Sequence, residues 1–282
     1  MSEHQQNCRE QFENKVIWIT GASSGIGEAL TKNFAACGAR LALSARNEAE
    51  LQRVRQECIA AGANGANLLV VTLDVVDYDA MPAAVDRVMH AFSRIDMLIN
   101  NAGMSQRSYC LDTDMDVYRT MVEVNVLGQI ALTKQVLPLM VEQGSGHMVV
   151  TASVAGKVGA PLRTGYCAAK HAVMGFFDAL RSEVAHQGIL VSTVVPGFIR
   201  TNISTNALKG SGEAVGKMDA DIESGMDVSE CARVVVQGLA DGIEEISVGD
   251  GPEMALLDLK RENPTQAFRA VEGMAAQLRS EM

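Results

Sequence analysis

The sequence lacks the features that are typical of proteins that bind nucleic acid or span a membrane. Its 24 Lys and Arg residues are outnumbered by 34 Asp and Glu residues, and the resulting net charge of −10 repels a phosphate backbone. Aromatic residues make up only 4% of the chain, too few for the stacking platforms that bind single strands. Residues 184–199 form one of the longest stretches without a charged side chain, shorter than the roughly 18 apolar residues of a spanning helix. We therefore expect neither nucleic acid nor a membrane as a partner.

The sequence also lacks the spacings of metal sites and disulfide frameworks. None of its six cysteines forms a Cys-x-x-Cys pair, and none of its five histidines forms a His-x-x-x-His pair. We predict no metal site and reduced thiols, which are typical of a cytoplasmic protein. Residues 1–14 are polar and have no apolar segment of the kind found in secretory signals, so we expect a polar N-terminal tail.

What the sequence contains is a regular alternation of short apolar strands and amphipathic helices. Strands are predicted at residues 16–20, 40–44, 67–73, 96–100, 146–152, 189–195 and 246–248, and helices at 25–38, 47–61, 78–92, 112–140, 165–187 and 228–241. Near-continuous apolar strands between helices predict a parallel sheet that is covered on both faces. We predict an α/β fold with three α/β/α layers, a Rossmann-like doubly wound parallel sheet in a single domain over residues 15–282.

Residues 200–227 interrupt this alternation with a polar, glycine-containing stretch that has little periodicity. Connections of this length in a compact domain are usually functional or disordered. The stretch follows the carboxyl end of a predicted strand, where doubly wound sheets bind ligands. We predict a lid over the substrate, and a solvated loop is the alternative.

A glycine-rich turn lies between the first predicted strand and the first helix. It contains Gly21, Ser23, Ser24, Gly25, Ile26 and Gly27. Glycines at such a turn let backbone amides approach a pyrophosphate, and the N-terminus of the following helix stabilises the negative charge. We interpret this turn as a phosphate-binding site, although a simple tight turn has the same local composition.

Tyr166 and Lys170 are the strongest catalytic candidates. They are four residues apart on a predicted helix and therefore share a face, which places an ammonium near a phenol. A neighbouring cation favours the phenolate, so Tyr166 is the predicted general acid/base. Ser153 ends the fifth predicted strand, where its hydroxyl can bond a substrate oxygen as charge develops. Each residue has a structural alternative, because Ser and Asn also cap turns and a Tyr or Lys on a helix is often only packed or solvated.

The ordered motifs resemble those of the short-chain dehydrogenase/reductase family. The resemblance spans residues 15–248, and residues 166–183 resemble the member 7 branch of that family. It implies that Asn125 holds a water in a proton relay with the lysine, and that Lys170, beside Tyr166, bonds the nicotinamide ribose. It further implies a set of residues around the rest of the cofactor: Asp74, Val75, Asn101, Ala102, Gly103, Pro196, Gly197 and Thr201.

The choice of cofactor depends on the end of the second predicted strand. An acid at this place bonds the ribose hydroxyls of NAD, but residues 44–46 contain none. Arg46 instead offers charge-assisted bonds to a 2′-phosphate, so we predict NADP. If Arg46 is only a solvated residue at a helix start, the cofactor is NAD.

The sequence thus predicts an NADP-dependent oxidoreductase that moves a hydride between nicotinamide and a carbonyl or secondary alcohol of a mainly apolar small molecule. The resemblance implies a homodimer or homotetramer. A non-catalytic dinucleotide sensor of the same fold is the alternative, and the presence of Ser153, Tyr166 and Lys170 together argues against it.

Overall fold

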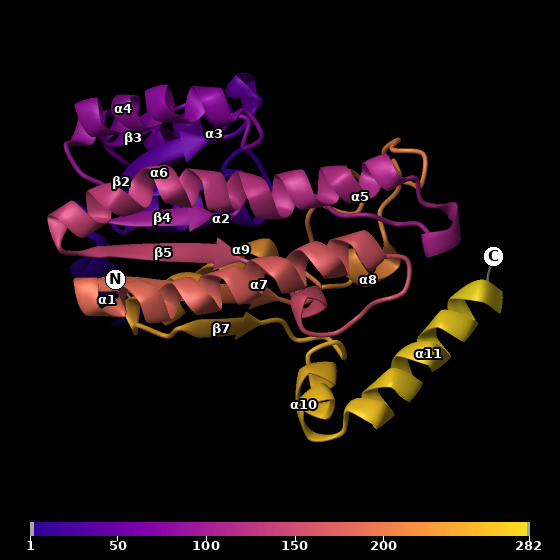
Figure 1. The fold of residues 1–282 in the computed structure, drawn as a ribbon. Coiled ribbons are helices and arrows are strands. Elements are labelled where there is room, and N and C mark those ends of the chain that lie inside the picture. The colour runs from indigo at the N-terminus through magenta and orange to yellow at the C-terminus, as the bar shows by residue number, and fades with distance from the viewer. Residues whose placement is uncertain (1–2, 281–282) are drawn as a thin grey trace.

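Seven parallel strands pair into one sheet in the computed structural model, which describes residues 3–280 (Figure 1). The strands are β1 Val16–Thr20, β2 Arg40–Ser44, β3 Leu68–Val70, β4 Met97–Asn100, β5 Gly146–Thr151, β6 Ile189–Pro196 and β7 Glu245–Val248. Their order is β3-β2-β1-β4-β5-β6-β7, so the winding reverses between β1 and β4. Doubly wound sheets bind ligands at the carboxyl ends of the strands beside such a reversal. The predicted fold class is confirmed.

Helices cover both faces of the sheet. The α-helices of the described residues are α1 Glu3–Phe12, α2 Gly25–Ala36, α3 Glu48–Ala60, α4 Met81–Phe92, α5 Met115–Val122, α6 Gly128–Gln143, α7 Thr164–Val184, α8 Ala220–Glu223, α9 Val228–Ala240, α10 Ala255–Glu262 and α11 Pro264–Ser280, of which α8, α10 and α11 lie beyond the carboxyl ends of the strands. Ile17 and Ile19 of β1 pack into the core shared with α2, α3 and α9, whereas Val16 and Trp18 pack into the core shared with α4, α6 and α7. Because both sides of β1 are buried, its sequence is continuously apolar.

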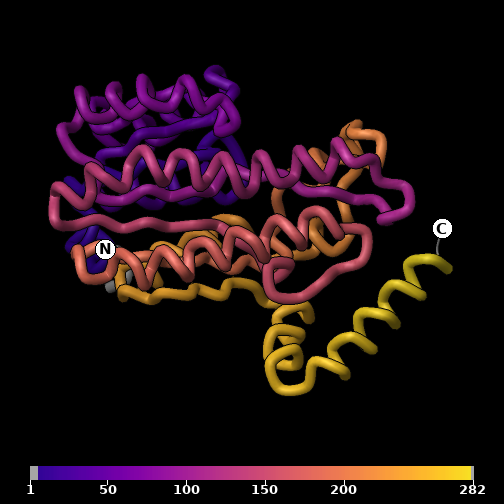
Figure 2. Tube along the Cα trace, in the orientation of Figure 1, coloured from indigo at the N-terminus to yellow at the C-terminus, as the bar shows by residue number. Residues whose placement is uncertain are grey.

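The run Met115–Gln143 is continuous from α5 through a π-helical segment, Glu123–Leu127, into α6 (Figure 2). By length and composition this run meets the requirements of a membrane span, but 44% of its most apolar window is buried inside the fold. Val117, Leu132 and Val136 are among the buried residues. Core packing therefore accounts for much of its apolar character.

The N-terminal residues differ from the predicted polar tail. Helix α1 occupies Glu3–Phe12, and its Cys8 and Phe12 are buried. The Phe12 ring meets the Phe34 ring edge-on, with centroids 5.0 Å apart. Two apolar residues four positions apart provide one buried stripe, and the polar majority on the other faces concealed it in the sequence.

Two segments lie at the carboxyl ends of the strands. Residues 200–227, predicted as a lid, include the short helix α8 and pair with the segment after β4 through a bridge between Leu208 and Gln106. Beyond β7, helices α10 and α11 extend outward from the sheet, with α11 standing apart from the body in Figure 1. Both segments contribute side chains to the cavity described next.

Candidate active site

A cavity of about 780 Å³ lies at the carboxyl ends of the strands. It brings together residues from the whole length of the chain that the sequence singled out: Gly21, Ser23, Ser24, Gly25, Ile26, Arg46, Asp74, Val75, Asn101, Ala102, Gly103, Asn125, Ser153, Tyr166, Lys170, Pro196, Gly197 and Thr201. Gly27 is the one predicted residue outside this lining, and it lies directly behind the glycine turn.

The glycine turn has a shape that only glycine permits. Gly21 adopts a φ of +67°, and a Cβ on Gly27 would lie 2.2 Å from the carbonyl oxygen of Gly21. Helix α2 begins at Gly25, and its N-cap Ser24 makes no side-chain capping bond. The first amides of α2 therefore remain open to a ligand, and the site fits a phosphate group.

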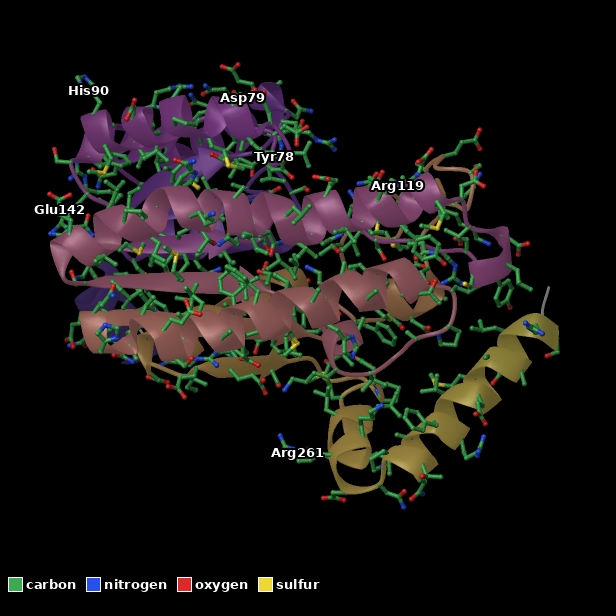
Figure 3. The ribbon with its side chains drawn as sticks, viewed as in Figure 1. Tyr78, Asp79, His90, Arg119, Glu142 and Arg261 are labelled. Carbon is green, nitrogen blue, oxygen red and sulfur yellow. The ribbon has the colours of Figure 1, made fainter. Side chains whose placement is uncertain are left out.

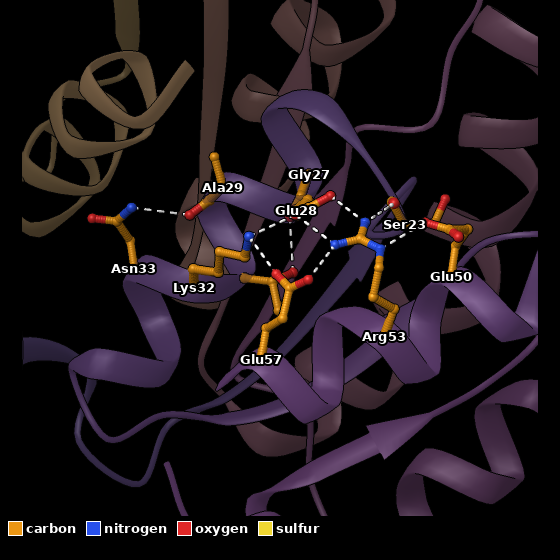
Figure 4. Close-up of polar contacts among 10 residues, drawn as sticks. Ser23, Gly27, Glu28, Ala29, Lys32, Asn33, Glu50, Arg53 and Glu57 are labelled. Carbon is orange, nitrogen blue, oxygen red and sulfur yellow. Dashed lines mark hydrogen bonds and ion pairs between the residues drawn. The ribbon is translucent and has the colours of Figure 1, made fainter. Parts of the chain in front are cut away.

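An ion-pair network supports this turn from α3 (Figure 4). Arg53 donates a hydrogen bond to the carbonyl oxygen of Ser23 at 3.3 Å and forms an ion pair with Glu28 at 2.7 Å. Lys32 forms a second ion pair with Glu28 at 2.6 Å. The network ties the glycine turn and the first residues of α2 to α3. It therefore holds in place the glycine turn and the first amides of α2, which together are called the phosphate cradle.

Arg46 lies just beyond the carboxyl end of β2, where it is exposed and lines the cavity. It forms no ion pair with any described residue, so its guanidinium is available to a ligand. Ser44 also lines the cavity, and its Oγ accepts a hydrogen bond from Trp18 Nε1 at 2.8 Å. Asp74 lines the same region and accepts a hydrogen bond from the Val76 amide at 3.2 Å.

Asn101 has a structural role in the centre of the sheet. Its Nδ2 donates to the carbonyl oxygen of Thr20 at 3.0 Å, and its Oδ1 accepts from Thr151 Oγ1 at 3.2 Å. The Thr20 hydroxyl in turn accepts from the amides of Asn101 and Ala102. These bonds fix the segment after β4 against β1 and β5.

Lys170 is buried at the base of the cavity with only 3% of its surface exposed. Its Nζ donates to the carbonyl oxygen of Thr151 at 2.8 Å and lies 5.8 Å from the centroid of the Tyr166 ring. Burial lowers the pKa of Lys170 to about 8, because removal from water disfavours the charged ammonium. The predicted proximity of the ammonium and the phenol is confirmed.

Tyr166 is also buried, and burial raises the pKa of its phenol. A hydrogen bond with Ser153 and the positive charge of Arg163 act in the opposite direction and lower this pKa. The sequence predicted that the Lys170 ammonium would favour the phenolate, but the pKa of Tyr166 is raised, because loss of hydration outweighs the effects of Ser153 and Arg163. Tyr166 is therefore protonated at neutral pH and can donate a proton.

Asn125 is completely buried within the π-helical segment. Its Nδ2 donates to the carbonyl oxygens of Met104 and Met121, at 3.1 Å and 3.0 Å, and its Oδ1 accepts from the Met104 amide at 3.2 Å. Single turns of π-helix often lie at functional sites. Asn125 thus fixes the wall beside Gly103, and its role in holding a water stays a prediction.

The sequence analysis missed three charged residues. Arg107, Arg163 and Asp219 meet at the same end of the cavity as Tyr166. Arg163 precedes Tyr166 by three residues, so helical spacing is a signal that would have identified it. Asp219 has no such signal, because only the path of residues 200–227 brings it to the arginines.

The chain is similar to proteins of a known family over most of its length. Residues 15–211 match the family model described as short chain dehydrogenase. Dehydrogenase/reductase SDR family member 7 of Homo sapiens is 41% identical over 267 residues, which cover 93% of this chain and 79% of that protein. Dehydrogenase/reductase SDR family protein 7-like of Drosophila melanogaster is 42% identical over 87% of this chain and 76% of its own length.

Solved structures show the same arrangement. A short chain dehydrogenase/reductase from Burkholderia phymatum in complex with NAD superposes with a TM-score of 0.79 at 27% identity, covering 90% of this chain and 95% of that one. Levodione reductase superposes with a TM-score of 0.76 at 28% identity, covering 86% of this chain and 99% of that one.

Proposed function

Because the chain belongs to the short-chain dehydrogenase/reductase family and is an oxidoreductase that uses a nicotinamide cofactor, we propose that it is NADP-dependent and acts on a carbonyl or secondary alcohol. One observation supports this most strongly. Tyr166, Ser153 and Lys170 converge on the cavity whose other end is the glycine turn. A proton donor and a phosphate cradle in one cavity are what hydride transfer to a carbonyl requires.

Tyr166, Ser153 and Lys170 have different roles in the proposed carbonyl reduction. The nicotinamide, when bound, supplies the hydride. The Tyr166 hydroxyl donates its proton to the substrate oxygen, and the Ser153 hydroxyl donates a hydrogen bond to the same oxygen as negative charge develops there. Lys170 would hold the cofactor ribose, and its charge favours the phenolate that remains after proton donation. Alcohol oxidation reverses these steps.

The preference for NADP rests on Arg46. Its guanidinium is exposed, lines the cavity and is unpaired within the described chain. A charged hydrogen bond to a 2′-phosphate contributes about 1.5 to 3 kcal/mol, or roughly 10-fold to 150-fold in affinity. Arg46→Asp would replace this bond with repulsion and offer an acceptor to the ribose hydroxyls of NAD. Dissociation constants of both cofactors test this, and equal weakening of both would refute the NADP assignment.

We propose a mainly apolar substrate, because apolar side chains such as Val154, Val158 and Leu208 line the cavity beside Tyr166. The test is a screen of ketones, aldehydes and alcohols that follows NADPH absorbance with the purified protein. Turnover of any carbonyl at a rate that depends on Tyr166 supports the proposal. Tight cofactor binding with no turnover across the panel would favour a non-catalytic dinucleotide sensor.

We further propose a homodimer or homotetramer that pairs α5–α6 and α7 across a two-fold axis. Val136 of α6 and Leu180 of α7 are buried in the core of their own subunit and do not form this contact. Val122 and Leu127 are 40% and 41% exposed on the α5–α6 run and are better candidates. Light scattering that finds only monomers at working concentrations would reject the assembly.

A further inference from the structure

Two arginines and one aspartate from three separate segments meet at the substrate end of the cavity. Arg107 follows β4, Arg163 precedes α7, and Asp219 is the N-cap of α8. Asp219 Oδ2 accepts a hydrogen bond from Arg163 Nη2 at 2.8 Å and another from Arg107 Nη1. The side chains of Asp219 and Arg163 are 6% and 14% exposed, so both are largely removed from water, whereas that of Arg107 is 32% exposed and remains partly hydrated.

The charges of this cluster do not balance. Two guanidinium groups share one carboxylate oxygen, and the other oxygen, Asp219 Oδ1, accepts from the Asp221 amide at 3.2 Å. Each guanidinium has five N–H donors, and within residues 3–280 each has Asp219 as its one hydrogen-bonding partner. One positive charge and several donors are left over.

These unused donors belong to side chains that form the cavity wall. Arg107 and Arg163 both line the cavity. The other acid at this end of the lining is Glu253, which accepts from the Phe198 amide at 2.7 Å and pairs with neither arginine in the described chain. A partly buried charged donor without a partner is costly, and an anionic ligand would offset that cost.

We propose that Arg107 and Arg163 form a carboxylate-binding subsite, so that the substrate is an oxo acid with an apolar chain between its carbonyl and its carboxylate. This inference rests on the proposed function, because it places the carbonyl at Tyr166. Planar guanidinium groups suit a carboxylate, which they bind through paired hydrogen bonds. Arg163 precedes Tyr166 by about one helical turn, so the two ends of the substrate are separated along α7.

The test measures binding to the protein loaded with oxidised NADP, which forms a complex with a ketone but cannot reduce it. The probes are a homologous series of methyl-ketone carboxylates beginning with levulinate, each compared with its methyl ester by calorimetry. At the matching chain length we expect the carboxylate to bind at least about 10-fold more tightly than its ester. Equal affinity of acid and ester at every length would overturn the subsite.

Two substitutions separate ligand binding from a purely structural role. Arg163→Gln should weaken the carboxylate at least about 10-fold while the dissociation constant of the ester stays nearly unchanged. Asp219→Asn keeps the N-cap oxygen but removes the competing charge, so it should tighten carboxylate binding several-fold. If Asp219 only holds residues 200–227 against the rest of the fold, Asp219→Asn weakens the binding of the acid and of the ester alike, and the proposal is wrong.

Arg119→Gln is the matched control, because Arg119 lies on the outer side of α5 and is 68% exposed (Figure 3). It makes the same charge change away from the cavity and should leave both probes unaffected. Reduction of the esters by NADPH reports on the proposed function independently. Ester reduction without a preference for the acid would reject the subsite alone, whereas absence of both binding and reduction would reject both proposals.

Discussion

The burial of Lys170 predicts that this residue destabilises the cofactor-free protein. Its pKa falls from 10.5 to about 8 on folding, which corresponds to about 3 kcal/mol of unfavourable free energy in the charged, folded state at pH 7. Lys170→Met keeps most of the packing but loses the bond to the Thr151 carbonyl, a cost of about 1 kcal/mol. We expect the variant to be more stable by about 2 kcal/mol at pH 7 and to lose activity and cofactor affinity.

The dependence of the free energy of unfolding on pH tests whether the buried ammonium of Lys170 is the cause. Between about pH 8 and 10.5 the unfolded chain holds a proton on Lys170 that the folded protein has released. The free energy of unfolding of the wild type should therefore rise with pH across this window relative to that of Lys170→Met. Urea denaturation without cofactor at pH 7 and pH 10 measures the free energies of unfolding of the wild type and of Lys170→Met. Lys134→Met, on the exposed face of α6, is the control. A wild type at least as stable as Lys170→Met at pH 7 would refute the reasoning.

Two further substitutions test the phosphate cradle. Gly27→Ala should weaken cofactor binding at least about 10-fold, because its Cβ would lie 2.2 Å from the Gly21 carbonyl oxygen. Gly175→Ala is the control and should leave binding intact, because nothing lies within 4 Å of a Cβ at that position. Unchanged titrations for Gly27→Ala would contradict the geometry of the turn. Arg53→Gln should weaken cofactor binding only a few-fold, since the ion-pair network of Arg53 is partly exposed. Arg233→Gln is the control, because it breaks an ion pair of α9 that lies outside the cavity lining. An effect no larger than that of the control would remove the supporting role of Arg53.

The fold was predictable because its signals are local and repeated. Apolar runs such as that of β1 need no partner to be recognised, and their alternation with helices fixes a parallel sheet. The glycine turn and the four-residue spacing of Tyr166 and Lys170 are equally local. The π-helical segment around Asn125 was not predicted, since one extra residue in a turn hardly alters the apolar pattern.

Features that depend on contacts between distant segments of the chain could not be predicted from the sequence. The direction of the Tyr166 pKa shift depends on how completely the fold excludes water from the phenol, which no spacing encodes. The cluster of Arg107, Arg163 and Asp219 joins three segments, and its members are ordinary surface residue types. Helix α1 was concealed by its polar composition, although Phe12 packs against Phe34.

The central claim, that Tyr166 exchanges the proton during hydride transfer, is tested most directly by Tyr166→Phe, which removes the hydroxyl and keeps the ring. Steady-state turnover of a carbonyl with NADPH should fall at least about 100-fold, while the dissociation constant of NADPH in a separate titration stays nearly unchanged. Turnover close to that of the wild type, with intact cofactor binding, would contradict the account.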